Sequence, residues 1–233
     1  MNSITAIVLC GGVGSRLKSI VKDIPKPLAE VNGLPFLDIL LKWMEKSKYL
    51  TSIVLAAGHL GHLIESRYSH LNKFRVGIKT VIETEKLGTG GAIFNSLTEI
   101  NTEHFIVLNG DSFINVDLDE ICSQHFSQGS DVTFTVKYLP DTSRFGRLKL
   151  SKESKKVIGF MEKANDQKGG YINCGLYIFR TDWARENFEE GNFSLEEWFQ
   201  VNIGKYNFDF FATDSNFIDM GTPESYLEIQ SFF

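Results

Sequence analysis

The sequence is poor in cysteine. Its three cysteines, Cys10, Cys122 and Cys174, are odd in number and widely spaced along 233 residues. Two of them, Cys10 and Cys174, lie in apolar runs typical of strands. The pattern suggests neither a disulfide framework nor a zinc site, and we expect a chain that works in a reducing compartment.

An excess of positive charge is also missing. Lys and Arg number 24 against 29 Asp and Glu, which gives a net charge of -5 and a pI near 5.6. No global positive field is therefore available to attract a nucleic acid or an anionic membrane. We expect neither as a partner, and any polyanion that binds should be small and met locally.

Long apolar runs are absent as well. The longest uncharged stretch, residues 49–64, is interrupted by two glycines and two histidines and is too short to span a bilayer. The first basic residue is Arg16, and the apolar run before it ends in two glycines, unlike a signal peptide. We expect a soluble protein of the cytoplasm.

The composition, 42% apolar and 23% charged, is sufficient for one large α/β domain or two small ones. No linker rich in proline or serine divides the chain, and no internal repeat is found. We expect one domain over residues 1–233, with a first half at 1–130 and a second half at 131–233.

The first half alternates β-branched runs with segments of helical period, which predicts βαβ units and a mainly parallel sheet. Strands are expected at 4–10, 52–57, 76–82 and 104–109, and helices at 35–46, 59–69, 90–97 and 118–126. The first strand is almost wholly apolar, as a strand covered on both faces must be.

The pattern changes in the second half. Four strands are expected at 132–138, 147–150, 157–161 and 171–179 without a long helix between them, then helices at 194–201 and 223–229 around a strand at 208–213. The predicted fold is a Rossmann-like mixed, mainly parallel sheet flanked by helices, with a small sheet-rich lobe. Ligands of such sheets bind beyond the carboxyl ends of the strands, so residues that follow strands are the candidates for a site.

A glycine-rich loop follows the first strand. Gly11, Gly12 and Gly14 allow backbone N–H groups to approach an anion, and the helix expected next directs its positive end at the same place. The loop is not a P-loop, and Leu17 stands where a dinucleotide fingerprint needs its third glycine. A tight turn with only a structural role is the alternative.

Cations follow this loop. Four Lys or Arg residues lie within 16–26 against a single acid. Such a run usually marks a solvated face, but beside a glycine loop it suits a triphosphate. Pro25 and Pro27 restrict the backbone around Lys26, which favours a positioned lysine.

Two carboxylates are candidates for a metal site. Asp111 follows an apolar strand, and Asp219 precedes the start of a helix. Mg²⁺ typically takes one or two carboxylates together with phosphate oxygens and water. The alternatives are a turn residue after Asn109-Gly110 and a local cap near Thr222.

Six stretches together resemble the successive signatures of sugar-1-phosphate nucleotidyltransferases. They occur in the family's order and cover essentially the whole chain: residues 9–17 with 26–28, 87–92, 108–111, 160–163, 171–175 and 219–224. Residues 22–27 and 87–92 are most similar to the D-glycero-D-manno-heptose 1-phosphate guanylyltransferases. The resemblance implies an enzyme that joins a nucleoside triphosphate, GTP in that subgroup, to a sugar 1-phosphate and releases pyrophosphate.

The resemblance also assigns residues. The nucleotide would be bound by Leu9, Gly11, Gly12, Gly14, Arg16, Lys26, Glu83, Gly88, Thr89, Asn109 and Asp111. The sugar phosphate would be bound by Gly110, Gly146, Glu162, Lys163, Asn173 and Gly175. Arg16, Lys26, Asp111 and Lys163 would be catalytic, and Asp111 with Asp219 would hold Mg²⁺. A β-bulge is the commoner reason for a glycine such as Gly175 inside a strand.

An acidic residue after the third strand favours guanine. Glu83 could accept from the adjacent N1–H and N2 amino groups of guanine, whereas uracil and thymine offer one imide N–H between two carbonyls. Glu85 competes for this role, because a register error would exchange the two, and both could be solvated loop residues.

Several alternatives stay open. The sugar could be mannose 1-phosphate, or the enzyme could be a uridylyl- or thymidylyltransferase. A glycosyltransferase would carry Asp-x-Asp where Asp111-Ser112-Phe113 stands, and a nucleotide sensor would lose the metal carboxylates. The 19 phenylalanines fit either a homodimer contact or a large core.

Overall fold

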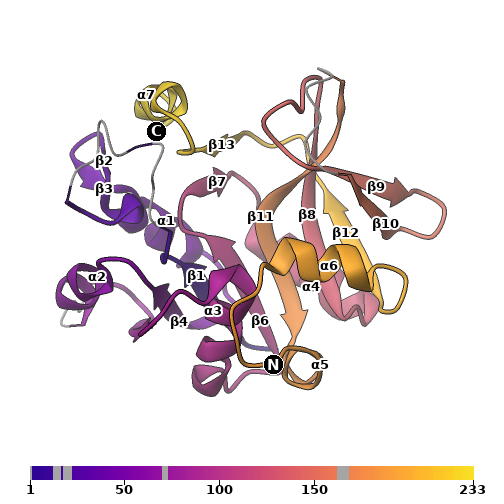
Figure 1. Ribbon diagram of the computed structural model, residues 1–233, viewed down its shortest axis with the longest axis horizontal. Coiled ribbons are helices and arrows are strands. Elements are labelled where there is room, and N and C mark those ends of the chain that lie inside the picture. Colours follow the sequence, from indigo (N-terminus) through magenta and orange to yellow (C-terminus); the bar gives the residue numbers. More distant parts are fainter. Residues whose placement is uncertain (1, 13–16, 18–22, 70–72, 162–167) are drawn as a thin grey trace.

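The computed structural model describes residues 2–12, 17, 23–69, 73–161 and 168–233. A nine-stranded sheet forms its centre (Figure 1). In spatial order the strands are β5 (Gly77–Ile82), β4 (Leu50–Ala57), β1 (Ile4–Leu9), β6 (His104–Asn109), β11 (Gly170–Arg180), β8 (Val132–Leu139), β12 (Phe208–Ala212), β10 (Lys156–Met161) and β9 (Arg147–Ser151). The expected mixed α/β fold is confirmed.

The sheet is parallel on one side and largely antiparallel on the other. Strands β5, β4, β1 and β6 pair in parallel, as predicted for the first half. Strand β11 runs antiparallel to both β6 and β8, while β12 is parallel to β8. The second half therefore extends the parallel sheet with antiparallel neighbours.

Two hydrophobic cores cover the opposite faces of the sheet. Along β1, Ala6 and Val8 belong to the first core and Ile7 to the second, because alternate side chains of a strand point to opposite faces. The first core contains residues of α1 (Phe36–Met44), α2 (Gly61–Tyr68), α4 (Leu118–Gln128) and α7 (Pro223–Gln230). The second contains residues of α3 (Gly88–Ser96), α5 (Thr181–Asn187) and α6 (Leu195–Asn202).

Each expected helix and strand of the described residues is present, with ends shifted by at most two residues. Five short elements were not predicted: β2 (Glu30–Val31), β3 (Leu34–Pro35), β7 (Ser112–Ile114), β13 (Phe217–Asp219) and α5, beside the 3₁₀ turns η2 (Lys26–Leu28) and η3 (Leu97–Glu99). The helix expected after the glycine loop lies outside the described residues.

The carboxyl ends of four parallel strands meet at one edge of the sheet. Leu9 is paired with both Ala56 and Asn109, and Ala57 with Ile82. Backbone hydrogen bonds continue this register beyond the strands, from the N–H of Glu83 to the carbonyl of Ala57 at 2.8 Å and from Gly110 to Leu9 at 2.9 Å. The loops after β1, β5 and β6 are therefore held side by side.

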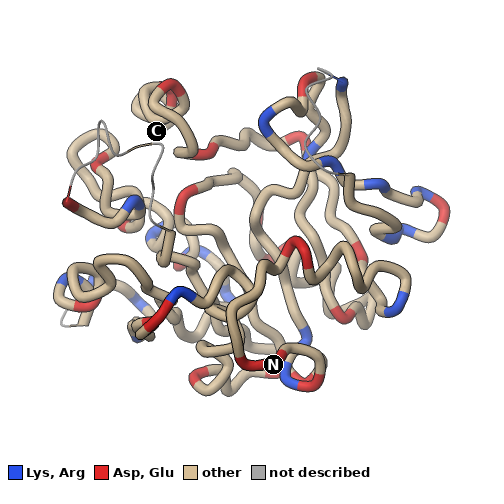
Figure 2. Tube along the Cα trace, viewed as in Figure 1, with Lys and Arg blue, Asp and Glu red and all other residues tan. Residues whose placement is uncertain are grey.

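The end of the chain returns to the first half. After β12 it crosses above the sheet as β13, which pairs with β7, and continues into α7 beside the β2–β3 hairpin (Figure 1). Several Lys and Arg positions lie along the β9–β10 hairpin at the other end of the molecule (Figure 2). Among the described helices, none is long and apolar enough to cross a membrane.

Candidate active site

A pocket of about 320 Å³ opens at the carboxyl edge of β1, β5 and β6. Its wall is formed by Leu9, Cys10, Gly11, Gly12, Lys26, Pro27, Glu83, Lys86, Gly88, Thr89, Ala92, Asn109 and Asp111. The volume is at the lower end of the range for small-molecule sites. Its position, beyond the carboxyl ends of parallel strands, is where ligands of open α/β sheets bind.

Lys26 and Asp111 form an ion pair on the pocket wall. The Lys26 ammonium lies 2.5 Å from Asp111 Oδ2, and the lysine side chain is only 10% exposed against 41% for the aspartate. Lys26 opens the 3₁₀ turn η2, in which Pro27 is buried. The ion pair and the burial of the side chain hold the ammonium in place, in agreement with the expectation of a positioned cation.

Glu83 lies over the glycine loop. Its Oε1 is 3.0 Å from the point where a Cβ on Gly11 would stand, and its Oε2 is 3.1 Å from the corresponding point on Gly58. Larger residues at either glycine would displace the carboxylate. Burial raises the pKa of Glu83, opposed by the N–H of Leu87, which donates to Oε2 at 3.4 Å. Glu85 is exposed and is not part of the pocket wall.

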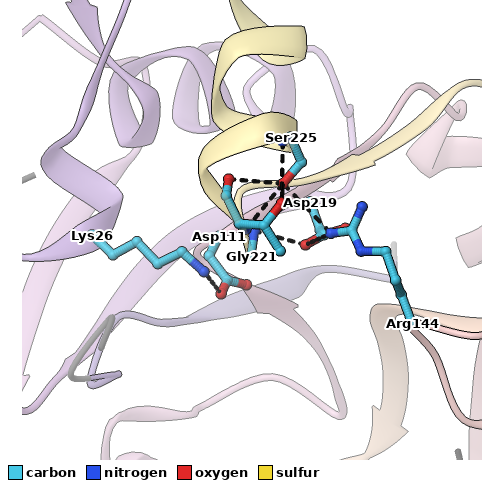
Figure 3. A network of polar contacts seen from close by, with 7 residues as sticks. Lys26, Asp111, Arg144, Asp219, Gly221 and Ser225 are labelled. Carbon is cyan, nitrogen blue, oxygen red and sulfur yellow. Dashed lines mark hydrogen bonds and ion pairs between the residues drawn. The ribbon is translucent and has the colours of Figure 1, made fainter. Parts of the chain in front are cut away.

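Asp219 and Asp111 come from neighbouring segments. The N–H of Met220 donates to the backbone carbonyl of Asp111 at 2.8 Å, at the end of the β7–β13 pair. Arg144 Nη2 donates to both oxygens of Asp219, at 3.0 and 2.9 Å, and the N–H of Gly221 donates to Oδ1 at 2.7 Å (Figure 3). Each carboxylate is thus neutralised by one cation.

The donor set is compatible with a magnesium ion that also binds phosphate. Within the described ranges, no group of three or more His, Cys, Asp or Glu side chains is placed to hold a metal ion. Two carboxylates on adjacent segments suffice where phosphate oxygens and water complete the octahedron. Asp111 and Asp219 fit that requirement.

The residues expected on the sugar side are engaged with one another. Gly175 has φ +70°, at a register shift in the pairing of β11 with β8, and a Cβ there would come within 2.4 Å of Asn109 Nδ2. Asn173 Oδ1 accepts from the Gly175 N–H at 3.1 Å, and its Nδ2 donates to the Tyr177 hydroxyl. The shift in pairing agrees with the bulge alternative and places Gly175 against Asn109, while a role of Gly175 in sugar binding stays a prediction.

The structure brings the predicted nucleotide residues together. Every one within the described residues lines the pocket: Leu9, Gly11, Gly12, Lys26, Glu83, Gly88, Thr89, Asn109 and Asp111. Gly14, Arg16, Glu162 and Lys163 lie outside the described residues. Gly110, Gly146, Asn173, Gly175 and Asp219 are not part of this wall. The binding and catalytic roles of all these residues stay predictions.

Sequence reasoning missed Cys10, Pro27, Lys86 and Ala92 on the wall, and Arg144 beside Asp219. Position in a recognised motif was an available signal for most of them, since Cys10, Pro27 and Ala92 stand inside the quoted stretches. Lys86 directly precedes one of those stretches, and Arg144 stands two residues before Gly146. Burial holds the Cys10 thiol protonated by raising its pKa, with Asp111 adding to the effect.

A Rossmann-like sheet with a glycine-lined pocket and a lysine–carboxylate pair at its edge defines an α/β protein with a small-molecule pocket at the carboxyl ends of its parallel strands. Residues 5–233 match the model of the nucleotidyl transferase family, and the chain belongs to that family. The family resemblance is confirmed, and the chain is a nucleotidyltransferase.

Similar proteins cover almost the whole chain. The D-glycero-alpha-D-manno-heptose 1-phosphate guanylyltransferase of Campylobacter jejuni is 37% identical over 95% of this chain and 96% of its own. The protein of the same name from Aneurinibacillus thermoaerophilus is 33% identical over 97% and 96%. The crystal structure of HddC from Yersinia pseudotuberculosis complexed with GMP-PN has a TM-score of 0.83 and 31% identity, covering 99% of both chains.

Proposed function

We propose that this chain transfers GMP from GTP to D-glycero-α-D-manno-heptose 1-phosphate, with release of pyrophosphate. The observation that carries the proposal is the placement of Glu83 and the Lys26–Asp111 pair in one pocket. Glu83 follows β5 and Asp111 follows β6, so the backbones of these two strands are three strand positions, or roughly 14 Å, apart. The Glu83 carboxylate extends over Gly11, between the two strands, and a nucleotide could place its base at Glu83 and its phosphates at Lys26.

The loop after β1 lies between these two groups. Gly11 and Gly12 are both on the pocket wall, so backbone groups are available to the nucleotide where side chains would fill the space. The half-buried carboxylate of Glu83 faces this loop. It favours guanine over other bases, because it can accept hydrogen bonds from the two adjacent donors of guanine. Uracil or thymine would instead place a carbonyl oxygen next to the Glu83 carboxylate.

The reaction needs no protein nucleophile. A phosphate oxygen of the sugar phosphate attacks the α-phosphorus in line, the new P–O bond replaces the bond to the β-phosphate oxygen, and pyrophosphate leaves. Catalysis of this type is positioning plus charge neutralisation. Lys26 would exchange its contact with Asp111 for the triphosphate, and Arg16 and Lys163 would contact the phosphates of the two substrates.

Mg²⁺ is part of the proposal. Asp111 and Asp219 would hold it, and when bound it would neutralise the phosphate oxygens around the reacting centre. On the sugar side, Gly110, Gly146, Glu162, Asn173 and Gly175 would contact the sugar phosphate. The glycosyltransferase alternative is disfavoured because Asp117, in the one Asp-x-Asp string, accepts from the Asp119 N–H at 2.8 Å and caps α4.

The cellular setting also belongs to the proposal. All three cysteines are free and buried, which suits the reducing cytoplasm. A GDP-activated heptose is a donor for capsule or other surface polysaccharides, and a homodimer would be a natural form for the enzyme. The polysaccharide setting follows from the resemblance, and the homodimer from the 19 phenylalanines as a contact surface.

Pyrophosphate release tests the proposal. GTP, ATP, UTP and dTTP are each combined with heptose 1-phosphate, mannose 1-phosphate and glucose 1-phosphate in the presence of Mg²⁺. We expect GTP with the heptose phosphate to give the highest kcat/KM, with GTP preferred by a factor on the order of 100 over the pyrimidine triphosphates. A preference for UTP or dTTP would exclude the guanylyl assignment, and a preference for mannose phosphate would exclude the heptose.

A further inference from the structure

Among the described residues, four with charged side chains line the pocket, and one of them has no role so far. Lys26 and Asp111 neutralise each other, and Glu83 is assigned to the base. The fourth is Lys86, in the loop between β5 and α3. It is an exposed residue and contributes to the wall three residues after Glu83.

Glu83 and Lys86 do not neutralise each other. Among the described residues, no group of opposite charge lies within 4.0 Å of either side chain, so neither forms an ion pair. The hydrogen-bond partner of the Glu83 carboxylate in this part of the chain is the N–H of Leu87 at 3.4 Å. Two residues of opposite charge therefore line the same pocket without an ion pair between them.

The loop that carries both residues is held at each end. The Glu83 N–H donates to the Ala57 carbonyl at 2.8 Å, which attaches the loop to β4. At the other end the Phe193 N–H donates to the Leu87 carbonyl at 3.0 Å, and the Gly90 N–H donates to the Phe193 carbonyl at 3.0 Å. The two charged side chains thus project from a backbone with a fixed direction.

We propose that Lys86 determines base specificity by donating a hydrogen bond to O6 of guanine while Glu83 accepts from N1–H and the N2 amino group. Guanine places its O6 acceptor directly beside these two donors, so a cation and a carboxylate on one short loop match its edge. Adenine presents an amino group where O6 stands and an acceptor where N1–H stands. This inference rests on the proposed guanylyl transfer and identifies a second residue of the base site.

An analogue without O6 tests the proposal. The triphosphate of 2-aminopurine riboside keeps the N2 amino group but lacks both O6 and the hydrogen on N1, so it also loses one contact with Glu83, and the effect of each variant is therefore compared within one substrate. We expect Lys86→Met to lower kcat/KM for GTP by roughly tenfold, because a charge-assisted hydrogen bond is lost at a solvent-exposed site, and to leave kcat/KM for the analogue unchanged. Lys86→Arg should retain most of the GTP activity.

Lys79→Met is the matched control. Lys79 lies on β5 close to Lys86 in sequence, but its ammonium pairs with Glu99 at 2.6 Å and it is not on the pocket wall. The control should leave both kcat/KM values unchanged, and thermal midpoints of all variants show whether they fold equally well.

The outcomes are distinct. An equal loss for GTP and the analogue in Lys86→Met would mean that Lys86 contacts phosphate or ribose, and no loss for GTP would mean that it does not contact the nucleotide. Either result overturns the role of Lys86 while the GTP preference of the unmodified enzyme stands. A wild-type preference for a pyrimidine triphosphate overturns the proposed function itself.

Discussion

Asp111 and Asp219 each face one cation, Lys26 and Arg144 respectively. A carboxylate that is neutralised in this way can exchange its cation for a metal ion without a large change in local charge. We expect Asp111→Asn and Asp219→Asn to keep the fold while turnover falls by several orders of magnitude, since each removes a charge that would offset the clustered phosphates.

Pyrophosphate release at saturating substrates, with circular dichroism of each variant, measures this effect. A chelator should abolish the wild-type activity, and added Mg²⁺ should restore it. Turnover near the wild-type value in either folded variant would show that the carboxylate does not hold the metal.

The ionised carboxylate of Glu83 is needed to bind guanine, but its burial destabilises the fold. Burial raises its pKa, so the ionised form that guanine needs is disfavoured in the folded protein. We expect kcat/KM for GTP to decline, on the acid side, at a higher pH than an ordinary glutamate would cause, because the protonated carboxyl cannot accept from both donors. This decline should be absent in Glu83→Gln, which should use GTP poorly at every pH.

Glu83→Gln should lower activity but raise the stability of the fold. A carboxyl whose pKa is raised in the folded state stabilises the fold below its unfolded pKa and loses that contribution as the pH rises through the folded value. At neutral pH, Glu83→Gln is therefore expected to raise the thermal midpoint slightly. A lowered midpoint would mean that the carboxylate supports the glycine loop.

At this scale the sequence predicted the wall of the pocket well, because glycines and short polar residues after apolar strands mark the edge of a parallel sheet. It could not predict Arg144 as a partner of Asp219, since 75 residues separate them and only the crossing of β13 brings them together. Gly175 shows the same limit: its neighbour is Asn109, on an adjacent strand.

Strands β6 and β8 and helix α4 are joined by a pair of histidines, of which His125 is buried and His104 is partly buried. His104 Nδ1 lies 3.1 Å from His125 Nε2, and His125 Nδ1 lies 2.7 Å from the Thr133 hydroxyl. Burial, then the nearby His104 and Arg180, lowers the pKa of His125 from 6.5 to about 3. The folded protein thus holds His125 neutral at a pH where the unfolded chain takes up a proton.

The fold should consequently lose stability as the pH falls below about 6.5, by up to roughly 1.4 kcal/mol per pH unit for this residue. Chemical denaturation between pH 7.5 and 5 measures the slope. We expect a shallower slope for His125→Gln, whatever its absolute stability, and an unchanged slope for His59→Gln, an exposed histidine. Equal slopes in all three proteins would contradict this source of acid sensitivity.

The long elements were predictable because their apolar period is strong, whereas the short ones depend on distant partners. β7 and β13 are three residues each and exist only as a pair. Helix α5 follows β11 without any break in the chain. The β2–β3 hairpin did have a local signal, since Asn32 and Gly33 at its turn both have positive φ, as an Asn-Gly hairpin turn requires.

Across the whole molecule, the two halves are joined by their cores and by the end of the chain. The first core includes residues of β11 and α7 from the second half, such as Ile178 and Ile229. Asn32, in the first half, contacts Gln230 and the backbone carbonyl of Phe233, and the Tyr226 hydroxyl donates to the Glu30 carbonyl at 2.6 Å.

A fragment of residues 1–130 should therefore not fold on its own. It would expose the edge of β6 and large apolar areas on both faces of the sheet, which a small domain cannot afford to leave in water. Circular dichroism and thermal unfolding of the fragment test this. A cooperative transition would show that the first half is an independent domain.

The separation of the two cores has a spectroscopic consequence. Trp43 lies on the α1 face, with its ring centroid 5.2 Å from that of Phe113, whereas Trp183 and Trp198 lie together on the other face, 5.6 Å apart. Intrinsic fluorescence therefore arises from two groups of emitters divided by the sheet. Variants that keep only Trp43, or only the other two, would report the unfolding of each face separately, without an added label.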